Sequence, residues 1–323
     1  MNKYYRDNTA WVEVQQFLPV EYRWQDGYGP EEEFRPWKSS TLHVERFANP
    51  DATHKIILLH GVGTNSRLLN LVAGAPLARA GYEVVAADMP YYGMTDNRET
   101  RITYEDWVEI GAELVRSEIA KDGKPVVLYG LSAGGMLAYD IAALTRQVSG
   151  IMGMCFIDSG SPLARRRMSD RPDMDEISFK TLPLLPAALL GRIRVPMKHL
   201  VKMKALVNDA QALKLLLRDR CSAGASVSLE FVNSMIQHRP AIAFEDFDLC
   251  PIILLQPGED RWTPFPVTEP FWERVAAPKQ MVTLDNASHY PIEQPGLDQM
   301  RDAMVKFIRS IGSVAGLLTA MYR

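Results

Sequence analysis

Short apolar runs alternate with segments of helical period along most of the chain, and this alternation constrains the fold more than any other feature. The runs lie at residues 56–60, 83–87, 125–129, 153–157, 251–255 and 280–284. Most are apolar throughout, as expected for strands that are covered on both faces of a mainly parallel sheet. The segments between them predict helices at residues 66–80, 104–121, 134–145, 266–277 and 297–311. Strands and helices in this order predict a doubly wound α/β fold.

One stretch breaks the alternation. About 90 residues separate the strand that ends near Ile157 from the strand that starts at Pro251, and they are mostly helical in period with no convincing strand. Unstructured loops of that length are uncommon in compact domains, so we expect a helical insertion on the sheet. We therefore divide the chain into an N-terminal extension (1–40), the first part of an α/β core (41–160), a helical cap (161–245) and the second part of the core with a C-terminal helix (246–323).

The charge of the chain is small but unevenly distributed. The chain carries 36 Lys and Arg against 39 Asp and Glu, a net charge of −3, which argues against a dedicated nucleic-acid binder. Residues 163–220 carry 13 Lys and Arg against 6 Asp and Glu, so this segment is +7 and the rest is −10. Three separated cysteines, Cys155, Cys221 and Cys250, predict neither a disulfide framework nor a zinc site. Because the N-terminus lacks a signal-peptide pattern, we expect a cytoplasmic protein.

The most specific motif is Gly130-Leu131-Ser132-Ala133-Gly134, which follows an apolar run and precedes a predicted helix. A sharp turn from strand to helix crowds the backbone around its central residue, so small residues are needed two positions before and two positions after it. Such a turn exposes the serine above the sheet, beside a helix N-terminus that favours developing negative charge. The alternative is a serine that caps the helix beside loop glycines. The flanking elements favour a nucleophile.

With this motif the sequence resembles the α/β-hydrolase superfamily over about residues 41–312, with the insertion where the family carries its cap. Four further segments are similar to the family's motifs, although Tyr91 stands where glycine is common: His60-Gly61-Val62-Gly63, residues 88–96, Gly258-Glu259-Asp260-Arg261 and Asn286-Ala287-Ser288-His289-Tyr290. The resemblance implies a serine hydrolase of the esterase or lipase type.

The residues also support a catalytic triad on chemical grounds. A serine hydroxyl is a weak nucleophile at neutral pH and needs an imidazole to take its proton, and the imidazole needs a carboxylate to fix its tautomer. Ser132, Asp260 and His289 follow the chain order of this fold, each after a predicted strand. Asp158, after the run 153–157, is an alternative acid or a residue that caps the entry to the insertion. His60 is expected to be structural.

The oxyanion hole is expected to use backbone N–H groups. We assign it to Ala133, which follows the nucleophile, and to Val62 in the segment His60-Gly61-Val62-Gly63, which we call the HG loop and in which Gly63 is an alternative donor. The sequence contains no metal-ligand cluster and no dinucleotide fingerprint, and a serine triad needs no cofactor. We therefore predict neither a cofactor nor a bound metal.

The substrate is predicted in class only. A serine at the elbow favours acyl transfer to water through an acyl-serine, and a carboxylic ester with an apolar acyl or alcohol group is the main prediction. Thioester, amide and carbon–carbon bond substrates fit the same triad, and a non-catalytic binding protein of this fold is the alternative from another class. The Leu-, Met- and Lys-rich cap either lines an apolar pocket with basic residues toward an anionic head group or membrane surface, or packs on the core with a solvated basic face.

Overall fold

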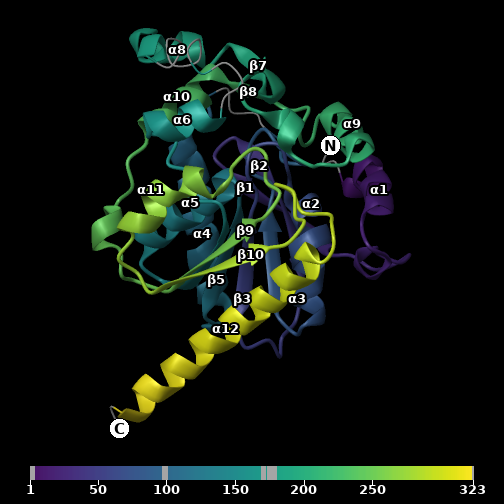
Figure 1. The fold of residues 1–323 in the computed structure, drawn as a ribbon, viewed down its shortest axis with the longest axis vertical. Helices are drawn as coiled ribbons and strands as arrows, with labels where there is room; N and C mark the ends of the chain where they lie inside the picture. The colour runs from purple at the N-terminus through teal and green to yellow at the C-terminus, as the bar shows by residue number, and fades with distance from the viewer. Residues whose placement is uncertain (1–3, 97–100, 169–171, 173–179, 322–323) are drawn as a thin grey trace.

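A computed structural model describes residues 4–96, 101–168, 172 and 180–321 of the chain. Its centre is an eight-stranded sheet in the order β1-β2-β4-β3-β5-β6-β9-β10 (Figure 1). The strands are β1 (Glu31–Trp37), β2 (Ser40–Phe47), β3 (Lys55–Leu59), β4 (Glu83–Ala87), β5 (Val126–Leu131), β6 (Val148–Met154), β9 (Ile252–Pro257) and β10 (Lys279–Leu284).

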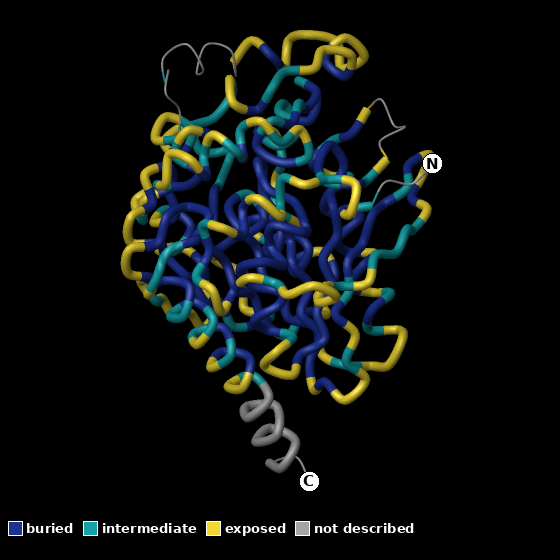
Figure 2. Tube along the Cα trace, turned by 90° about the vertical axis from the view of Figure 1, so that its right-hand side faces the viewer, coloured by how far each residue is buried: buried dark blue, intermediate teal, exposed yellow. Residues whose placement is uncertain are grey.

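The sheet is mainly parallel. From β4 to β10 every pair of neighbouring strands is parallel, whereas β2 is antiparallel to both β1 and β4. All residues of β3, β4, β5 and β9 are buried, because helices cover both faces of the sheet (Figure 2). This explains why these strands are mainly apolar rather than alternating. The predicted α/β fold class, with a doubly wound and mainly parallel sheet, is confirmed.

Two layers of helices enclose the sheet. One layer contains α2, α3 and α12, and the other contains α4 and α5, which pack against each other (Figure 1). The predicted helix at 66–80 is divided by a π-helical turn, Asn70–Gly74, into two short α-helices. The helices of the core are α2 (Ser66–Leu69), α3 (Ala75–Arg79), α4 (Tyr104–Asp122), α5 (Ala133–Thr145), α11 (Phe265–Arg274) and α12 (Gly296–Met321).

The N-terminal segment contributes a strand that the sequence analysis did not assign. Residues 31–37, within the predicted extension 1–40, form β1 at the edge of the sheet. Their sequence, EEEFRPW, lacks the apolar pattern of a strand because its carboxylates pair with basic groups. Glu32 contacts His43 of β2 at 2.8 Å, and Glu33 contacts Arg35 at 2.6 Å. Before this strand lies the short helix α1 (Ala10–Val14), which packs against α9 (Ala210–Arg218) of the insertion.

The segment predicted as the cap, residues 161–245, lies over one end of the sheet (Figure 1). It contains α6 (Pro162–Met168), α8 (Ala187–Leu190), α9 and α10 (Leu229–Gln237). The prediction that this segment lacks strands was wrong, because β7 (Arg194–Pro196) pairs with β8 (Ser226–Ser228) in a small antiparallel sheet. Strands of three residues are too short to leave a period in the sequence. Five of the charged residues counted in the sequence analysis lie outside the described residues: Asp170, Arg171, Asp173, Asp175 and Glu176.

Short 3₁₀ turns connect several of these elements, at Tyr5–Asp7, Gln15–Phe17, Val20–Tyr22, Leu182–Leu184, Met197–His199, Met203–Ala205 and Phe244–Asp246. Among the described residues, no helix combines the length and the apolar character needed to cross a bilayer.

Candidate active site

Ser132 lies at the turn between β5 and α5, in a backbone conformation that few residues adopt. Its φ of 59° and ψ of −125° are outside the regions that side chains normally allow. A Cβ at Gly130 would collide with the backbone of Gly134, and a Cβ at Gly134 would collide with Leu59 O. The two glycines of the motif are therefore required by close backbone contacts. The turn is buried, and the exposed fraction of Ser132 is 1%.

Asp260 and His289 meet at the same end of the sheet, in the loops that follow β9 and β10. His289 Nδ1 lies 2.9 Å from Asp260 Oδ2, and both side chains are buried. The other carboxylate oxygen, Oδ1, accepts hydrogen bonds of 2.8 Å from the backbone N–H groups of Trp262 and Thr263. The carboxylate is thus held on both sides, and one of its oxygens faces the imidazole.

The electrostatics of this pair favour an ionised carboxylate. Burial by itself raises the pKa of Asp260, but the adjacent His289 ring and the hydrogen bonds from Thr263 outweigh it and lower the pKa to about 2. An ionised Asp260 accepts a hydrogen bond from the Nδ1–H of His289. The proton is therefore on Nδ1, and the free lone pair of the ring is on Nε2. That tautomer is the one a general base requires.

Two polar side chains that the sequence analysis did not identify complete this network. The Thr263 hydroxyl donates to Asp260 Oδ2 at 2.8 Å and lies 3.0 Å from His289 Nδ1. Cys155, just after β6, has its Sγ 2.7 Å from the Thr263 hydroxyl, and burial raises the pKa of this thiol. The φ of Cys155 is 72°, an uncommon value for a residue other than glycine. No motif marks either residue, because their role depends on three loops that meet only in the folded chain.

The second nitrogen of His289 is unpaired. Nε2 is buried and has no hydrogen-bond partner among the described residues. The ring packs against Trp262, with 4.6 Å between ring centroids. Hydrogen bonds between base and nucleophile are often long or absent without substrate, so a buried Nε2 with a free lone pair is compatible with a general base.

The HG loop lies directly against the elbow. A Cβ at Gly61 would lie 2.6 Å from Leu131 O, 2.8 Å from Ser132 Cβ and 3.0 Å from Ala133 N, so a larger residue does not fit. No hydrogen bond is recorded for the N–H of Val62 or of Ala133 within the described part of the chain. Both donors are therefore available near Ser132. Gly63, the alternative donor, has a φ of 94° and is in contact with Met203 of the cap.

The competing histidine and aspartate have other partners. Asp158 Oδ1 accepts the N–H of Gly160 at 3.0 Å, which is the capping arrangement considered as its alternative role. His60 Nε2 accepts the N–H of Met89 at 2.9 Å, and its Nδ1 lies 2.9 Å from Gly61 O. His60 is thus fixed by backbone groups on both ring nitrogens. The structure brings Asp260, rather than Asp158, to His289.

A small apolar cavity of about 90 Å³ adjoins Ser132. The core contributes Val62, Ala133 and Trp262 to its wall, and the cap contributes mainly apolar side chains, including Met197, Leu200, Val201, Phe231 and Met235. The segment predicted as the cap lines one side of this cavity, which is smaller than the usual site for a small molecule, roughly 300–1,000 Å³.

Within the described part of the chain, two groups of side chains have the donor atoms to hold a metal ion. Cys155, Asp260 and His289 form the first, and Glu32, His43 and Glu45 form the second, with donor atoms within 4.8 Å in each. In the first, Asp260 and His289 already bond to each other. In the second, Glu32 bonds to His43, and Glu45 bonds to Arg67. The carboxylates of both groups thus already bond to side chains of the protein.

The sequence from residue 56 to residue 299 matches the family described as the alpha/beta hydrolase family. The chain belongs to this family. The match confirms the resemblance inferred from the motifs and identifies the chain as an enzyme of the α/β-hydrolase type.

Esterases are among the proteins whose sequences match this chain. A pimeloyl-[acyl-carrier protein] methyl ester esterase from Neisseria meningitidis serogroup C is 24% identical over 250 residues, which cover 76% of this chain and 91% of the relative. The same enzyme from serogroup A is 24% identical over 249 residues, covering 76% of this chain and 74% of the relative.

Solved structures of the same fold include two lipases. A soluble variant of monoglyceride lipase from Saccharomyces cerevisiae, in complex with a substrate analogue, superposes with a TM-score of 0.70 at 16% identity, covering 88% of this chain and 97% of that one. Monoacylglycerol lipase from Paleococcus ferrophilus has a TM-score of 0.60 at 20% identity, covering 84% and 99%. At these identities the likeness establishes the fold alone.

Proposed function

We propose that this chain hydrolyses a carboxylic ester through an acyl-serine intermediate on Ser132. The observation that carries the proposal is the buried pair of Asp260 and His289, with Nδ1 and Oδ2 separated by 2.9 Å, at the same sheet end as the serine elbow. The esterases among the relatives support an ester as the substrate class.

In the proposed mechanism His289 Nε2 takes the proton of the Ser132 hydroxyl as Oγ attacks the carbonyl carbon. The carbonyl π electrons move to oxygen and give a tetrahedral oxyanion, which the N–H groups of Val62 and Ala133 stabilise. As the intermediate collapses, the bond to the leaving oxygen breaks, and Nε2 returns the proton to the departing alcohol. Water then attacks the acyl-serine by the same steps and releases the acid.

Asp260 acts on this reaction through the imidazole. Its carboxylate fixes the tautomer with the proton on Nδ1 and stabilises the imidazolium that forms during each proton transfer. The low pKa of about 2 keeps it ionised throughout the neutral range. The bonds from Trp262 and Thr263 keep its orientation fixed, so little reorganisation is needed in the transition state.

We propose that the cap spans residues 161–245 and lines the substrate pocket. Its apolar wall over Ser132 suits an apolar acyl or alcohol group, and burial of the ester there excludes water until the leaving group has departed. The present cavity of about 90 Å³ holds a short group, so we expect longer substrates to require displacement of the cap.

Labelling by a fluorophosphonate, located by peptide mass spectrometry, tests the proposal. We expect folded protein to be labelled at Ser132 and to hydrolyse a p-nitrophenyl ester, and Ser132→Ala to lose both. Ser159→Ala is the matched control, because Ser159 lines the same cavity without a role in the mechanism. Unlabelled Ser132 in active protein, or labelling at another residue, would refute the proposal. Folded protein that shows neither labelling nor turnover would favour the non-catalytic alternative.

A further inference from the structure

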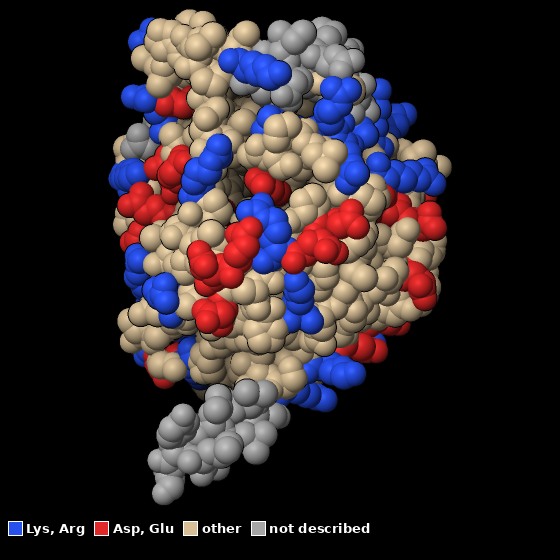
Figure 3. Space-filling view, turned by 60° about the vertical axis from the view of Figure 1, so that its left-hand side comes forward, with Lys and Arg blue, Asp and Glu red and all other residues tan. Residues whose placement is uncertain are grey.

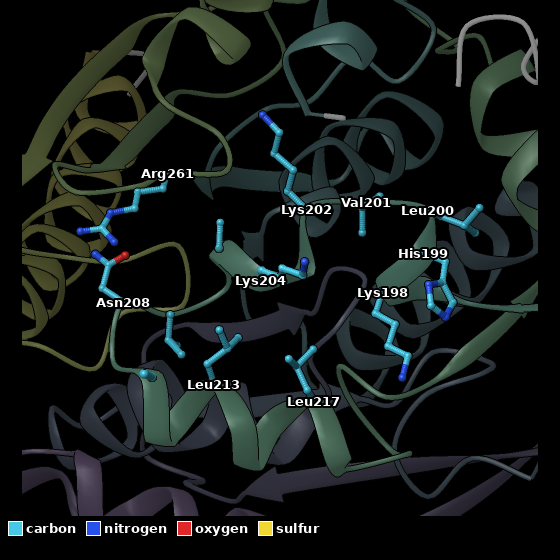
Figure 4. A pocket seen from close by; sticks show the side chains of 13 residues that line it. Lys198, His199, Leu200, Val201, Lys202, Lys204, Asn208, Leu213, Leu217 and Arg261 are labelled. Carbon is cyan, nitrogen blue, oxygen red and sulfur yellow. The ribbon is translucent and has the colours of Figure 1, made fainter. Parts of the chain in front are cut away.

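A second and much larger hollow lies on the outer side of the cap. This groove, which we call the cap groove, has a volume of about 940 Å³ and runs between α9 and the segment that follows β7. Figure 4 shows Leu213 and Leu217 projecting from α9 toward Lys204, with Arg261 at one end of the groove and Lys198 at the other. The groove therefore combines an apolar floor with basic ends.

The charges of the cap groove have one sign. Lys198, Lys202, Lys204 and Arg261 line it, and no Asp or Glu of the described residues does. Among the described residues, Lys198, Lys204 and Arg261 have no carboxylate within 4.0 Å, and Lys202 donates to the backbone oxygen of Arg167. A neighbouring recess of about 760 Å³ shares Lys198 and Leu217 and adds further arginines. Figure 3 shows that Lys and Arg predominate over the upper part of the face that it brings forward, whereas acidic and basic residues are interspersed over the lower part.

Asp209 and Glu259 adjoin the groove lining in sequence, and among the described residues neither forms an ion pair with these cations. Asp209 precedes α9, and its carboxylate accepts the N–H groups of Gln211 and Ala212 at 2.8 Å. Glu259 precedes Asp260 in the loop after β9, and its backbone oxygen accepts the side-chain amide of Asn208 at 3.1 Å. The carboxylate of Asp209 is therefore engaged at the helix terminus, and unpaired positive charge remains in the groove.

The cap groove and the catalytic cavity share a wall. Leu200 and Val201 line both, so these two side chains separate the groove from the space over Ser132. Arg261 is adjacent in sequence to Asp260, on the loop that carries the proposed acid. A ligand in the groove therefore lies within one side-chain layer of the site of chemistry.

We propose that the cap groove binds the anionic group of an amphiphilic ester substrate, such as a single-chain acyl ester that carries a phosphate or carboxylate. The apolar floor accepts the chain, and Lys198, Lys204 and Arg261 supply the countercharge for the anion. The ester reaches Ser132 when Leu200 and Val201 move aside. This inference rests on the proposed ester hydrolase function.

A binding experiment tests the groove independently of turnover. Octyl phosphate and octyl glucoside, both below their micelle concentrations, are titrated calorimetrically into the wild type, into Lys204→Glu/Arg261→Glu and into Lys214→Glu/Lys306→Glu. The last pair is the matched control, because both lysines are exposed and neither lines the groove. Since each partly exposed ion pair with a phosphate contributes a few-fold in affinity, we expect reversal of two charges to weaken octyl phosphate about tenfold.

The control variant should bind octyl phosphate as the wild type does, and octyl glucoside should bind at least about tenfold more weakly than octyl phosphate. Absent or non-saturable binding of octyl phosphate, equal affinity for both amphiphiles, or equal losses in the two double variants would overturn the proposal. The protein could instead sediment with phosphatidylglycerol vesicles and fail to bind monomeric octyl phosphate. That result would assign this face to a membrane surface and would also overturn the proposal.

A turnover experiment connects the groove with the active site. The ratio of kcat/KM for 1-octanoylglycerol 3-phosphate over 1-octanoylglycerol should fall about tenfold in Lys204→Glu/Arg261→Glu and stay constant in the control. Hydrolysis of both esters with an unchanged ratio would contradict the groove proposal and leave the hydrolase intact. Octyl phosphate binding without hydrolysis of any ester would contradict the hydrolase and limit the groove to a binding site.

Discussion

The core and the cap satisfy their charged groups in different ways. In the core, cations are buried against carboxylates: Lys55 Nζ lies 3.4 Å from Glu118 Oε2, and Arg67 pairs with Glu45. In the cap, Lys198 and Lys204 are exposed beside apolar side chains and lack such partners among the described residues. Leu184, also in the cap, is 81% exposed. The comparison indicates that the core fixes one geometry for chemistry, whereas the cap offers unsatisfied groups to a ligand.

The largest effect should come from the base in the core. His289→Ala removes the acceptor of the serine proton, so we expect kcat/KM for a p-nitrophenyl ester to fall about 10⁵-fold or more. Far-ultraviolet circular dichroism should be unchanged, which separates loss of chemistry from loss of fold. His54, which precedes β3 at the opposite end of that strand from the active site, is the matched control, and His54→Ala should retain activity. Retention of activity by His289→Ala would place the chemistry elsewhere.

A smaller but still large effect should distinguish the two candidate acids. Asp260→Asn leaves His289 in the wrong tautomer, and we expect kcat to fall about 10⁴-fold. Asp158→Asn keeps a side-chain oxygen that accepts the N–H of Gly160, so kcat should fall less than about fivefold. Parallel steady-state kinetics of the two variants decide between them. A greater loss in Asp158→Asn would reverse the assignment of the acid.

Thr263 should have an intermediate effect through the carboxylate that it contacts. Thr263→Val removes the hydroxyl bond to Asp260, and we expect kcat to fall about tenfold. Because the pKa of Asp260 is lowered to about 2, its ionised form stabilises the folded state above pH 4, and this contribution is lost as the pH falls to 2.

The variant raises the pKa of Asp260 toward its unfolded value. Thr263→Val should therefore lose less free energy of unfolding than the wild type between pH 4 and pH 2, as measured by urea unfolding. Thr145→Val is the control, since its hydroxyl bonds to Ile141 O in α5. Identical acid profiles of wild type and Thr263→Val would show that Thr263 does not act on Asp260.

The smallest effect should come from the exposed apolar surface of the cap. Leu184→Ser removes little buried area, so the free energy of unfolding should change by less than about 0.5 kcal/mol. Leu58→Ala, at a fully buried position of β3, should lower it by about 2–5 kcal/mol. Chemical denaturation measures both. Equal losses would mean that the cap is packed as tightly as the core and would remove the contrast between them.

How far the sequence predicted this molecule depends on the range of the contacts involved. The buried strands and the elbow at Ser132 were predictable because apolar runs and the two glycines at 130 and 134 act locally. Strand β1 was not, because its carboxylates are satisfied by residues distant in sequence, such as His43. Thr263 lies only three residues after Asp260, but its contacts with Cys155 and His289 join three loops and leave no pattern in the sequence. The catalytic roles of Ser132, Asp260 and His289 stay predictions.

The central claim is that Ser132 carries the acyl group during turnover. Rapid quenching of the enzyme with excess p-nitrophenyl butyrate, followed by intact-protein and peptide mass spectrometry, tests it most directly. We expect a burst of p-nitrophenol and one butyryl group on the peptide that contains Ser132. Turnover without any covalent adduct, or an adduct on another residue, would contradict it.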